Sequence, residues 1–153
     1  MDEERDIEMN INYTNTLTPE EFNALRTAVG WGAIESSSAA KGLEHTALVV
    51  SARDGEKAVG MARAITDYGY VVYISDVVVL PEYQGQGIGR ELMSRIMAYV
   101  DKNTAPGQEK LTVLVAAQGK EEFYEKLGFI RRPAEGMGCG MSLQIKKEAE
   151  DTP

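Results

Sequence analysis

A short glycine-rich turn between an apolar stretch and a helix-forming stretch constrains this chain most. The apolar stretch is Val77-Val78-Val79-Leu80, and the turn is Gly85-Gln86-Gly87-Ile88-Gly89. Three glycines within five residues allow the backbone to approach a ligand that side chains would hold away. The helix that follows presents unpaired N–H groups and the positive end of its dipole at the same place. The segment therefore predicts a strand, an anion-binding turn and a helix, with a group such as a pyrophosphate at the turn.

Two common glycine-rich patterns do not fit this turn. A P-loop requires Lys-Ser or Lys-Thr after its last glycine, and neither follows here. The dinucleotide fingerprint G-x-G-x-x-G requires two residues before its third glycine, but only Ile88 stands there. The spacing that does fit is Gln84-x-x-Gly87-x-Gly89. With this spacing the turn resembles the acyl-CoA signature of the GCN5-related N-acetyltransferases.

The flanking sequence extends this resemblance over about residues 46–131. Val77-Val78-Val79 is similar to the central strand of the family, and Phe123-Tyr124-Glu125-Lys126-Leu127-Gly128-Phe129 is similar to its second motif. The resemblance implies an α/β fold with a mixed central sheet of about six or seven strands and helices on both faces. It also implies that the fourth and fifth strands splay apart so that pantetheine lies between them.

Composition favours one soluble domain without disulfides or metal. The 153 residues suffice to bury a core, and we expect a single domain over residues 1–147 followed by an acidic tail over 148–153. The net charge of −8 argues against nucleic-acid or anionic-membrane partners and is compatible with a cationic substrate. A single cysteine, Cys139, and a single histidine make a disulfide framework and a metal site unexpected. The chain shows no signal peptide and no apolar run of membrane length, so we expect a cytoplasmic protein.

Hydrophobic periodicity outlines the remaining elements. Thr18-Pro19-Glu20-Glu21 is a capping box that opens a first helix, and Asp54-Gly55 is a hairpin turn. The helix after the glycines carries a core-facing apolar stripe. Strands are predicted over residues 7–13, 46–53, 57–66, 71–80, 111–116 and 140–146, and further helices over residues 36–43 and 121–127.

The resemblance assigns the cofactor, acetyl-CoA, to two regions. Backbone N–H groups near Val77 and Val79 would meet the acetyl carbonyl and the pantetheine, and the turn would hold the pyrophosphate. Lys120 stands where the family often carries an asparagine, and a lysine can reach a CoA phosphate as a point charge. The cofactor-binding residues that we predict are Val77, Val78, Val79, Gln84, Gly85, Gln86, Gly87, Ile88, Gly89, Arg90, Lys120, Phe123, Tyr124 and Lys126.

Tyr124 and Asp76 are the candidate catalytic residues. Family tyrosines at the position of Tyr124 lie near the sulfur and are thought to protonate it, and a phenol is a suitable donor to a thiolate. The alternative is a core aromatic, because Phe123, Tyr124 and Leu127 have helical spacing. Asp76 is predicted to point to the same face of its strand as Val72, Ile74, Val78 and Leu80. There it either orients or deprotonates the amine, or it is a structural carboxylate satisfied by backbone donors.

The resemblance implies an acceptor pocket around the early helices and the turn of the third strand, where family members often build it. Trp31, Glu35, Tyr68 and Tyr70 combine aromatics with a carboxylate, which suits a cationic amine. Tyr73 and Ser75 are predicted to point away from the face of Asp76, and either is a substrate contact. Each of these residues taken alone is also compatible with a plain surface or core position.

The resemblance implies an acetyl-CoA-dependent N-acetyltransferase that acts on a primary amine of a small molecule by direct attack in a ternary complex. Two alternatives stay open: acetylation of a protein or peptide amine, and a CoA-binding sensor without catalysis. The resemblance also favours a homodimer.

Overall fold

The computed structural model describes residues 10–150, and the chain divides into two compact units. The first unit extends to Leu114 and holds the sheet; the second begins at Val115 and holds one short helix. Ile7 and Met9 of the predicted first strand lie outside the described residues. The single domain over residues 1–147 stays a prediction.

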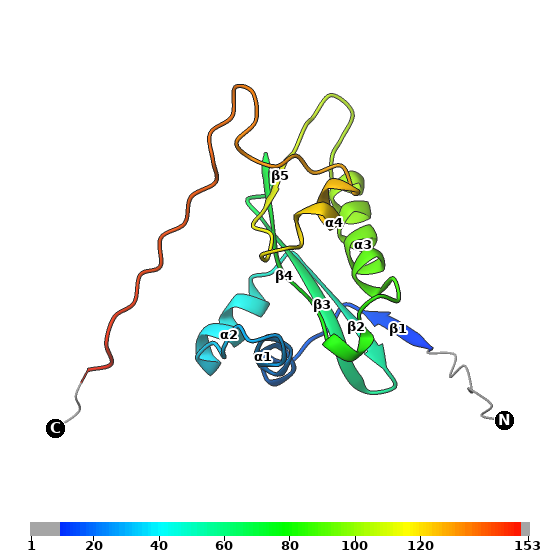
Figure 1. The fold of residues 1–153 in the computed structure, drawn as a ribbon, viewed down its shortest axis with the longest axis vertical. Helices are drawn as coiled ribbons and strands as arrows, with labels where there is room; N and C mark the ends of the chain where they lie inside the picture. Colours follow the sequence, from blue (N-terminus) through cyan, green and yellow to red (C-terminus); the bar gives the residue numbers. More distant parts are fainter. Residues whose placement is uncertain (1–9, 151–153) are drawn as a thin grey trace. The chain divides into compact units, whose positions relative to one another are not determined.

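The first unit is built on a five-stranded mixed sheet in the order β1-β2-β3-β4-β5 (Figure 1). Neighbouring strands from β1 to β4 pair antiparallel, whereas β5 pairs parallel to β4. The strands are β1 (Ile11–Thr14), β2 (Leu48–Asp54), β3 (Lys57–Thr66), β4 (Val71–Val79) and β5 (Leu111–Leu114). The predicted mixed α/β class is confirmed, and the bounds predicted for β3 are those observed.

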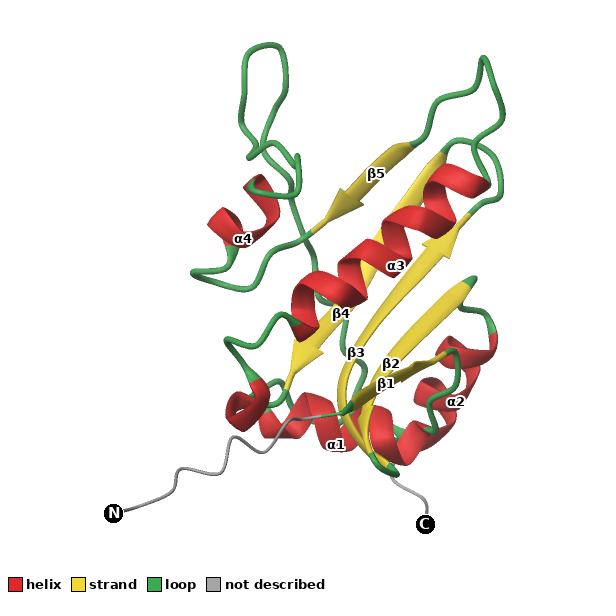
Figure 2. Ribbon diagram, turned by 90° about the vertical axis from the view of Figure 1, so that its right-hand side faces the viewer, coloured by secondary structure: helices red, strands yellow, loops and turns green. Residues whose placement is uncertain are grey.

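Helices cover both faces of the sheet, as predicted. α1 (Pro19–Ala28) and α2 (Ser36–Glu44) lie on one side, and α3 (Ile88–Lys102) lies across β2, β3 and β4 on the other (Figures 1 and 2). The predicted apolar stripe of α3 is buried, with Leu92 and Ile96 fully enclosed. Gly60 on β3 lets this helix approach closely, since a Cβ there would lie 3.3 Å from Leu92 Cδ1.

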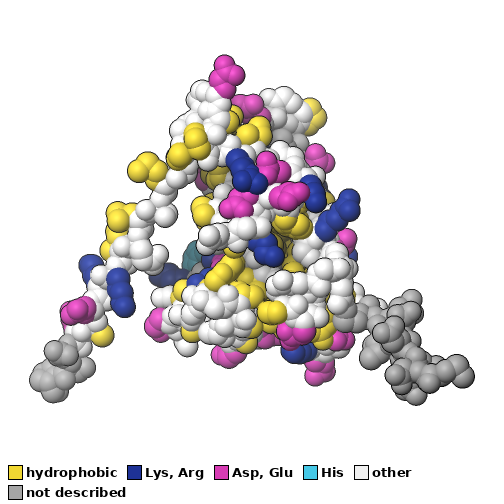
Figure 3. Space-filling view, in the orientation of Figure 1, with side chains coloured by type: hydrophobic (Ala, Val, Ile, Leu, Met, Phe, Trp, Pro, Cys, Tyr) yellow, Lys and Arg dark blue, Asp and Glu magenta, His cyan; other side chains and the backbone are white. Residues whose placement is uncertain are grey.

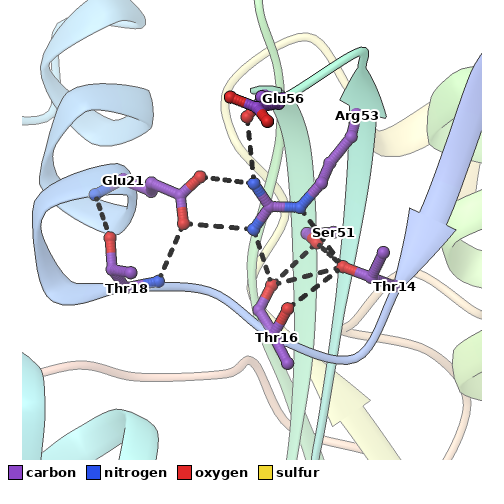
Figure 4. A network of polar contacts seen from close by, with 7 residues as sticks. All are labelled: Thr14, Thr16, Thr18, Glu21, Ser51, Arg53 and Glu56. Carbon is purple, nitrogen blue, oxygen red and sulfur yellow. Dashed lines mark hydrogen bonds and ion pairs between the residues drawn. The ribbon is translucent and has the colours of Figure 1, made fainter.

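The capping box of α1 forms as predicted and continues into a wider network (Figure 4). Thr18 Oγ1 accepts from the Glu21 N–H at 3.1 Å, and Glu21 Oε1 accepts from the Thr18 N–H at 3.0 Å. The same carboxylate pairs with the Arg53 guanidinium of β2 at 2.5 and 3.1 Å. A local sequence signal therefore also anchors the start of α1 to the sheet.

The predicted splay between β4 and β5 corresponds to an early end of their pairing. β5 pairs with β4 only from Val71 to Ile74, so the rest of β4 has no partner strand on that side within residues 10–150. Just beyond this point Asp76 adopts a φ of 54°, and the β3–β4 register shifts between Met61 and Arg63. Such an irregularity re-aims side chains and ends regular pairing.

The predicted strand over Gly140–Lys146 does not form, which leaves five strands instead of about six or seven among the described residues. Its apolar residues are largely exposed, at 96% for Met141, 84% for Leu143 and 76% for Ile145. Figure 3 shows hydrophobic side chains in yellow at the surface along the C-terminal segment. Alternation predicts two faces for a segment, but a strand also needs a neighbouring strand to pair with. That partner is a tertiary property which the local pattern does not contain.

The second unit contains one short helix, α4 (Glu121–Glu125), which ends two residues before the predicted boundary. Gly128 follows with a φ of 98°, and the Phe129 N–H donates to the Tyr124 carbonyl at 3.1 Å. The predicted glycine cap is thus present, with 3₁₀-type bonds tightening the last turn. None of the helices from residue 10 to residue 150 has the length and apolar character needed to cross a membrane.

Candidate functional site

The turn between β4 and α3 exposes a row of backbone donors. Gly87 is the N-cap of α3 with a φ of 84°, and no side chain caps this helix. Within the described part of the chain, the backbone N–H groups from Gly85 to Arg90 have no hydrogen-bond acceptor. A Cβ built on Gly85 or Gly87 meets nothing within 4 Å, so the space above the turn is open. Unpaired amides at the positive end of a helix dipole form an anion-binding site.

The end of β4 presents further donors at its unpaired edge. The Leu80 N–H donates to the Val59 carbonyl of β3 at 2.9 Å. Because backbone groups alternate in direction along a strand, those of Val79 and Val77 face the opposite edge, where β5 no longer pairs. The Gln84 side-chain amide donates to the Val79 carbonyl at 2.9 Å on this edge. Gln84 therefore ties the turn to the strand.

Asp76 does not point to the face that the sequence predicts for it. Its Oδ1 accepts from Arg26 Nη1 of α1 at 2.6 Å, and its Oδ2 accepts from Arg63 Nε at 2.7 Å. Val72 instead lines a small cavity with Tyr99 of α3, on the other face. The left-handed backbone at Asp76 breaks the alternation, so Asp76 joins Ser75, whose hydroxyl donates to it at 3.0 Å.

The partners of Asp76 are two side-chain cations and the Ser75 hydroxyl, whereas the structural alternative expected backbone donors. The Asp76 side chain is only 6% exposed, and both of its oxygens are occupied. This geometry favours a structural role, and the role of base stays a prediction. Sequence reasoning missed Arg26 and Arg63, although both stand at apolar positions. Arg26 follows Phe22 by four residues on the buried face of α1, and Arg63 interrupts an alanine-rich buried strand.

The predicted acceptor residues fall into two groups. Trp31 lies beside this ionic cluster, with the Arg26 guanidinium 5.6 Å from its ring centroid, and Ser75 belongs to the cluster itself. Tyr73 lies two residues before Ser75 on the same face of β4 and is about one-third exposed. Tyr68 and Tyr70 precede β4, whose first residue is about 17 Å along the strand from Asp76, so they do not join the cluster.

Glu35 is occupied as the N-cap of α2. Its carboxylate accepts from the Ser37 hydroxyl at 2.5 Å and from the Ser37 and Ser38 N–H groups at 3.0 Å each. These hydrogen bonds, the Ser37 hydroxyl first, lower the pKa of Glu35 to about 2. The Glu35 carboxylate, which the sequence predicts as a partner for a cationic amine, is therefore already occupied by hydrogen bonds at the start of α2.

Tyr124 is the one buried residue of α4. Its ring lies 5.0 Å from that of Phe123 and 6.0 Å from that of Phe129, both edge to face. Burial raises the pKa of Tyr124 to about 12, which keeps the phenol protonated. Lys120 is the N-cap of this helix, and Lys126 forms an exposed ion pair with Glu122.

Comparison with known proteins gives consistent matches. The model of the acetyltransferase (GNAT) family matches residues 12–129. An "uncharacterized N-acetyltransferase ycf52" of Porphyra purpurea is 29% identical over 127 residues, which are 80% of this chain and 71% of that protein. A "histone acetyltransferase TAP1" of Glycine max is 30% identical over 124 residues, which are 74% of this chain but only 52% of that protein. The structure of a "probable acetyltransferase" from meticillin-resistant Staphylococcus aureus is 30% identical with a TM-score of 0.81, covering 89% of this chain and all of that one.

Proposed function

Since the chain belongs to the acetyltransferase (GNAT) family and is an N-acetyltransferase, we propose that it transfers the acetyl group of acetyl-CoA to a primary amine of a small molecule. The observation that carries this proposal is the row of backbone N–H groups from Gly85 to Arg90 at the start of α3. These donors suit the oxygens of a pyrophosphate, and the dipole of a 15-residue helix adds to them.

The residues beside this turn fit the rest of the cofactor. The N–H groups of Val77 and Val79 face an unpaired strand edge, where they would hold pantetheine and the thioester carbonyl oxygen. When bound, acetyl-CoA supplies an acyl group activated as a thioester. The open space above Gly85 and Gly87 leaves room for phosphates that a side chain would displace.

The chemistry requires one proton acceptor for the amine and one proton donor for the departing thiolate. Tyr124 is our proposed donor, because burial keeps its phenol protonated at every working pH. In direct attack the amine nitrogen would bond to the carbonyl carbon and the carbon–sulfur bond would break. Water would take the proton that the amine loses, and Tyr124 would give its proton to the thiolate sulfur. Asp76 is proposed to hold the β4 bulge and its neighbouring N–H groups in place.

A protein amine is the second candidate acceptor. The observation that favours it is the 30% identity to a relative named as a histone acetyltransferase. The net charge of −8 also suits a basic protein surface.

The proposal retains the predicted homodimer and cytoplasmic location, which light scattering and cell fractionation test.

The deciding experiment measures release of the CoA thiol from acetyl-CoA across a panel of acceptors. The panel holds polyamines, amino sugars and their phosphates, arylalkylamines, amino acids and a lysine-rich histone peptide. Multiple turnovers with a small amine support the proposal, and turnover with the peptide alone supports the second candidate. Acetylation of Cys139 stops at one equivalent and is thereby recognised. Absence of turnover with every acceptor, while acetyl-CoA still binds, overturns both candidates in favour of a CoA sensor.

A further inference from the structure

Two guanidinium groups converge on one carboxylate beside the point where β4 loses its partner strand. Arg26 and Arg63 each donate to Asp76, and each guanidinium carbon lies 5.6 Å from the ring centroid of Phe22. The three side chains together carry an excess of one positive charge. One arginine would neutralise Asp76, so the second is a partly buried cation that has no further carboxylate partner among residues 10–150. Such a cation is costly unless another anion joins it.

Each arginine also keeps a donor unused. Arg26 donates through Nε to the Gly32 carbonyl at 3.2 Å and through Nη1 to Asp76. Arg63 donates through Nε to Asp76 and through Nη1 to the Thr46 hydroxyl at 2.9 Å. For Nη2 of either arginine, no acceptor exists among residues 10–150. The side chains are 17% and 16% exposed, and neither unpaired Nη2 is a buried atom, so a ligand can reach these donors.

The surface next to these donors is apolar and aromatic. On the α1 side of the sheet, Arg63 pairs across the strands with Ser75, and Ile65 pairs with Tyr73 one step further along the same face. Ile65 and Tyr73 are each 36% exposed. The aromatic Trp31, 39% exposed, lies against Arg26. A ligand here would place an anionic group on the guanidinium groups and an apolar body over the strand face.

We infer that the amine acceptor carries an anionic group, a carboxylate or a phosphate, which the Nη2 donors of Arg26 and Arg63 bind. This inference rests on the proposed function and replaces the purely cationic amine that the sequence suggested. That suggestion rested on the net charge, on the nearby aromatic residues and on the Glu35 carboxylate, and this carboxylate is occupied as the N-cap of α2. Planar guanidinium groups match the oxygens of carboxylates and phosphates, and their hydrogen bonds are charge-assisted.

The test compares acceptors that differ only in the anionic group. The carboxylate pairs are phenylalanine with 2-phenylethylamine and lysine with 1,5-diaminopentane; the phosphate pair is glucosamine 6-phosphate with glucosamine. We expect kcat/KM to be about tenfold higher for the anionic member of at least one pair, because hydrogen bonds to a charged group typically contribute that much to binding. A preference within the carboxylate pairs or within the phosphate pair identifies the anion. Equal or lower kcat/KM for the anionic member of all three pairs overturns the inference and leaves the proposed function standing.

Variants assign the preference to the two arginines. Arg26→Gln and Arg63→Gln each leave Asp76 one guanidinium partner, and each should reduce the ratio within the preferred pair to about one- to threefold, because one of the charge-assisted bonds is lost. The matched control is Arg53→Gln, since Arg53 is equally buried but pairs with Glu21. Its ratio should equal that of the wild type. Because the ratio is measured within one variant, a general loss of folded protein cancels; an unchanged ratio in both arginine variants overturns the assignment.

Binding of the products separates this inference from the proposed function. If no amine is turned over, calorimetry compares N-acetylphenylalanine with N-acetyl-2-phenylethylamine, and N-acetylglucosamine 6-phosphate with N-acetylglucosamine. Tighter binding of an anionic product, lost in Arg26→Gln, supports the anion site even though the proposed reaction has failed. Equal binding within both pairs overturns the anion site as well.

Discussion

Arg63 Nε on β3 and Asp76 Oδ2 on β4 lie 2.7 Å apart. Strict alternation along β4 would place the Asp76 side chain on the opposite face of the sheet, away from Arg63. The φ of 54° at Asp76 turns the carboxylate toward α1, and the ion pairs with Arg63 and Arg26 hold it there. The strained residue thus stands between the paired and the unpaired parts of β4.

Replacing Asp76 by Asn should destabilise the protein strongly. Asparagine also tolerates a positive φ, so the variant removes the charge and leaves the backbone preference intact. Two partly buried guanidinium groups would lose their counter-charge, and we expect the free energy of unfolding to fall by about 3 kcal/mol. Urea denaturation measures this loss, with exposed Asp101→Asn as the control. Wild-type stability combined with a changed pH–rate profile would instead favour Asp76 as the base.

Replacing Gly87 by Ala should weaken binding of acetyl-CoA. Gly87 has a φ of 84°, and its new methyl group would enter the open space above the turn where we propose that the phosphates bind. Gly107 has a φ of 83° and also has open space around it, so Gly107→Ala is a matched control for backbone strain. Both variants should lose about 1 kcal/mol of stability. Only Gly87→Ala should raise the Kd for acetyl-CoA in calorimetry; an unchanged Kd would exclude the turn as the phosphate site.

Removing the Tyr124 hydroxyl should slow turnover without weakening cofactor binding. Loss of a positioned proton donor typically costs about 100-fold in kcat, and Tyr124→Phe keeps the aromatic contacts with Phe123 and Phe129. Steady-state kinetics and calorimetry with acetyl-CoA together give both quantities. Tyr13→Phe on β1 is the control and should retain the kcat of the wild type. A Tyr124→Phe enzyme with unchanged kcat would leave Tyr124 as a core aromatic only.

The pH dependence should show that Tyr124 stays protonated in the folded protein. Burial raises its pKa to about 12, above the value of about 10 in an unfolded chain. The folded state therefore favours the neutral phenol, and this contribution to stability is complete below about pH 10 and is lost as the pH rises toward 12. A spectrophotometric titration that follows tyrosinate absorbance should show the same number of tyrosines titrating near pH 10 in the wild type and in Tyr124→Phe, because Tyr124 itself titrates only near pH 12. Full titration of all tyrosines near pH 10 in the native protein would contradict the buried position.

Replacing Gly60 by Ala should separate α3 from the sheet. A Cβ at this position lies 3.1 Å from the Val78 carbonyl oxygen and 3.3 Å from Leu92 Cδ1, and the backbone oxygen belongs to a paired strand that yields little. Overpacking of this kind costs about 1–3 kcal/mol. Thermal unfolding measures the loss, and Gly138→Ala, with open space and no positive φ, is the control. Equal midpoints of thermal unfolding for the two variants would mean that β4 and α3 move enough to accommodate the new methyl group at little cost.

The sequence predicted correctly those elements whose stabilising interactions lie between residues close together in the chain. The capping box at Thr18 and Glu21, the bounds of β3 and the buried stripe of α3 follow from hydrogen-bonding groups and periodicities within a few residues. The glycine turn was also predictable from local sequence, because residues that accept a positive φ are needed to leave the backbone N–H groups at the start of α3 exposed. These elements carry the part of the candidate site at which we propose that the cofactor binds.

The ionic cluster at which we propose that the acceptor binds depends on contacts between distant residues. Arg26 and Arg63 are 50 and 13 positions from Asp76 in the chain, and neither periodicity nor spacing indicates that they meet. The strand predicted over residues 140–146 was wrong. The sequence pattern also did not indicate that Glu35 is the N-cap of α2. Alternation assumes an extended backbone at every residue, and a single left-handed residue reverses it. The sequence alone therefore determined the class of fold and the glycine turn before α3, whereas only the tertiary structure decided which charged side chains meet beside β4, because ion pairs across strands and helices are made by packing.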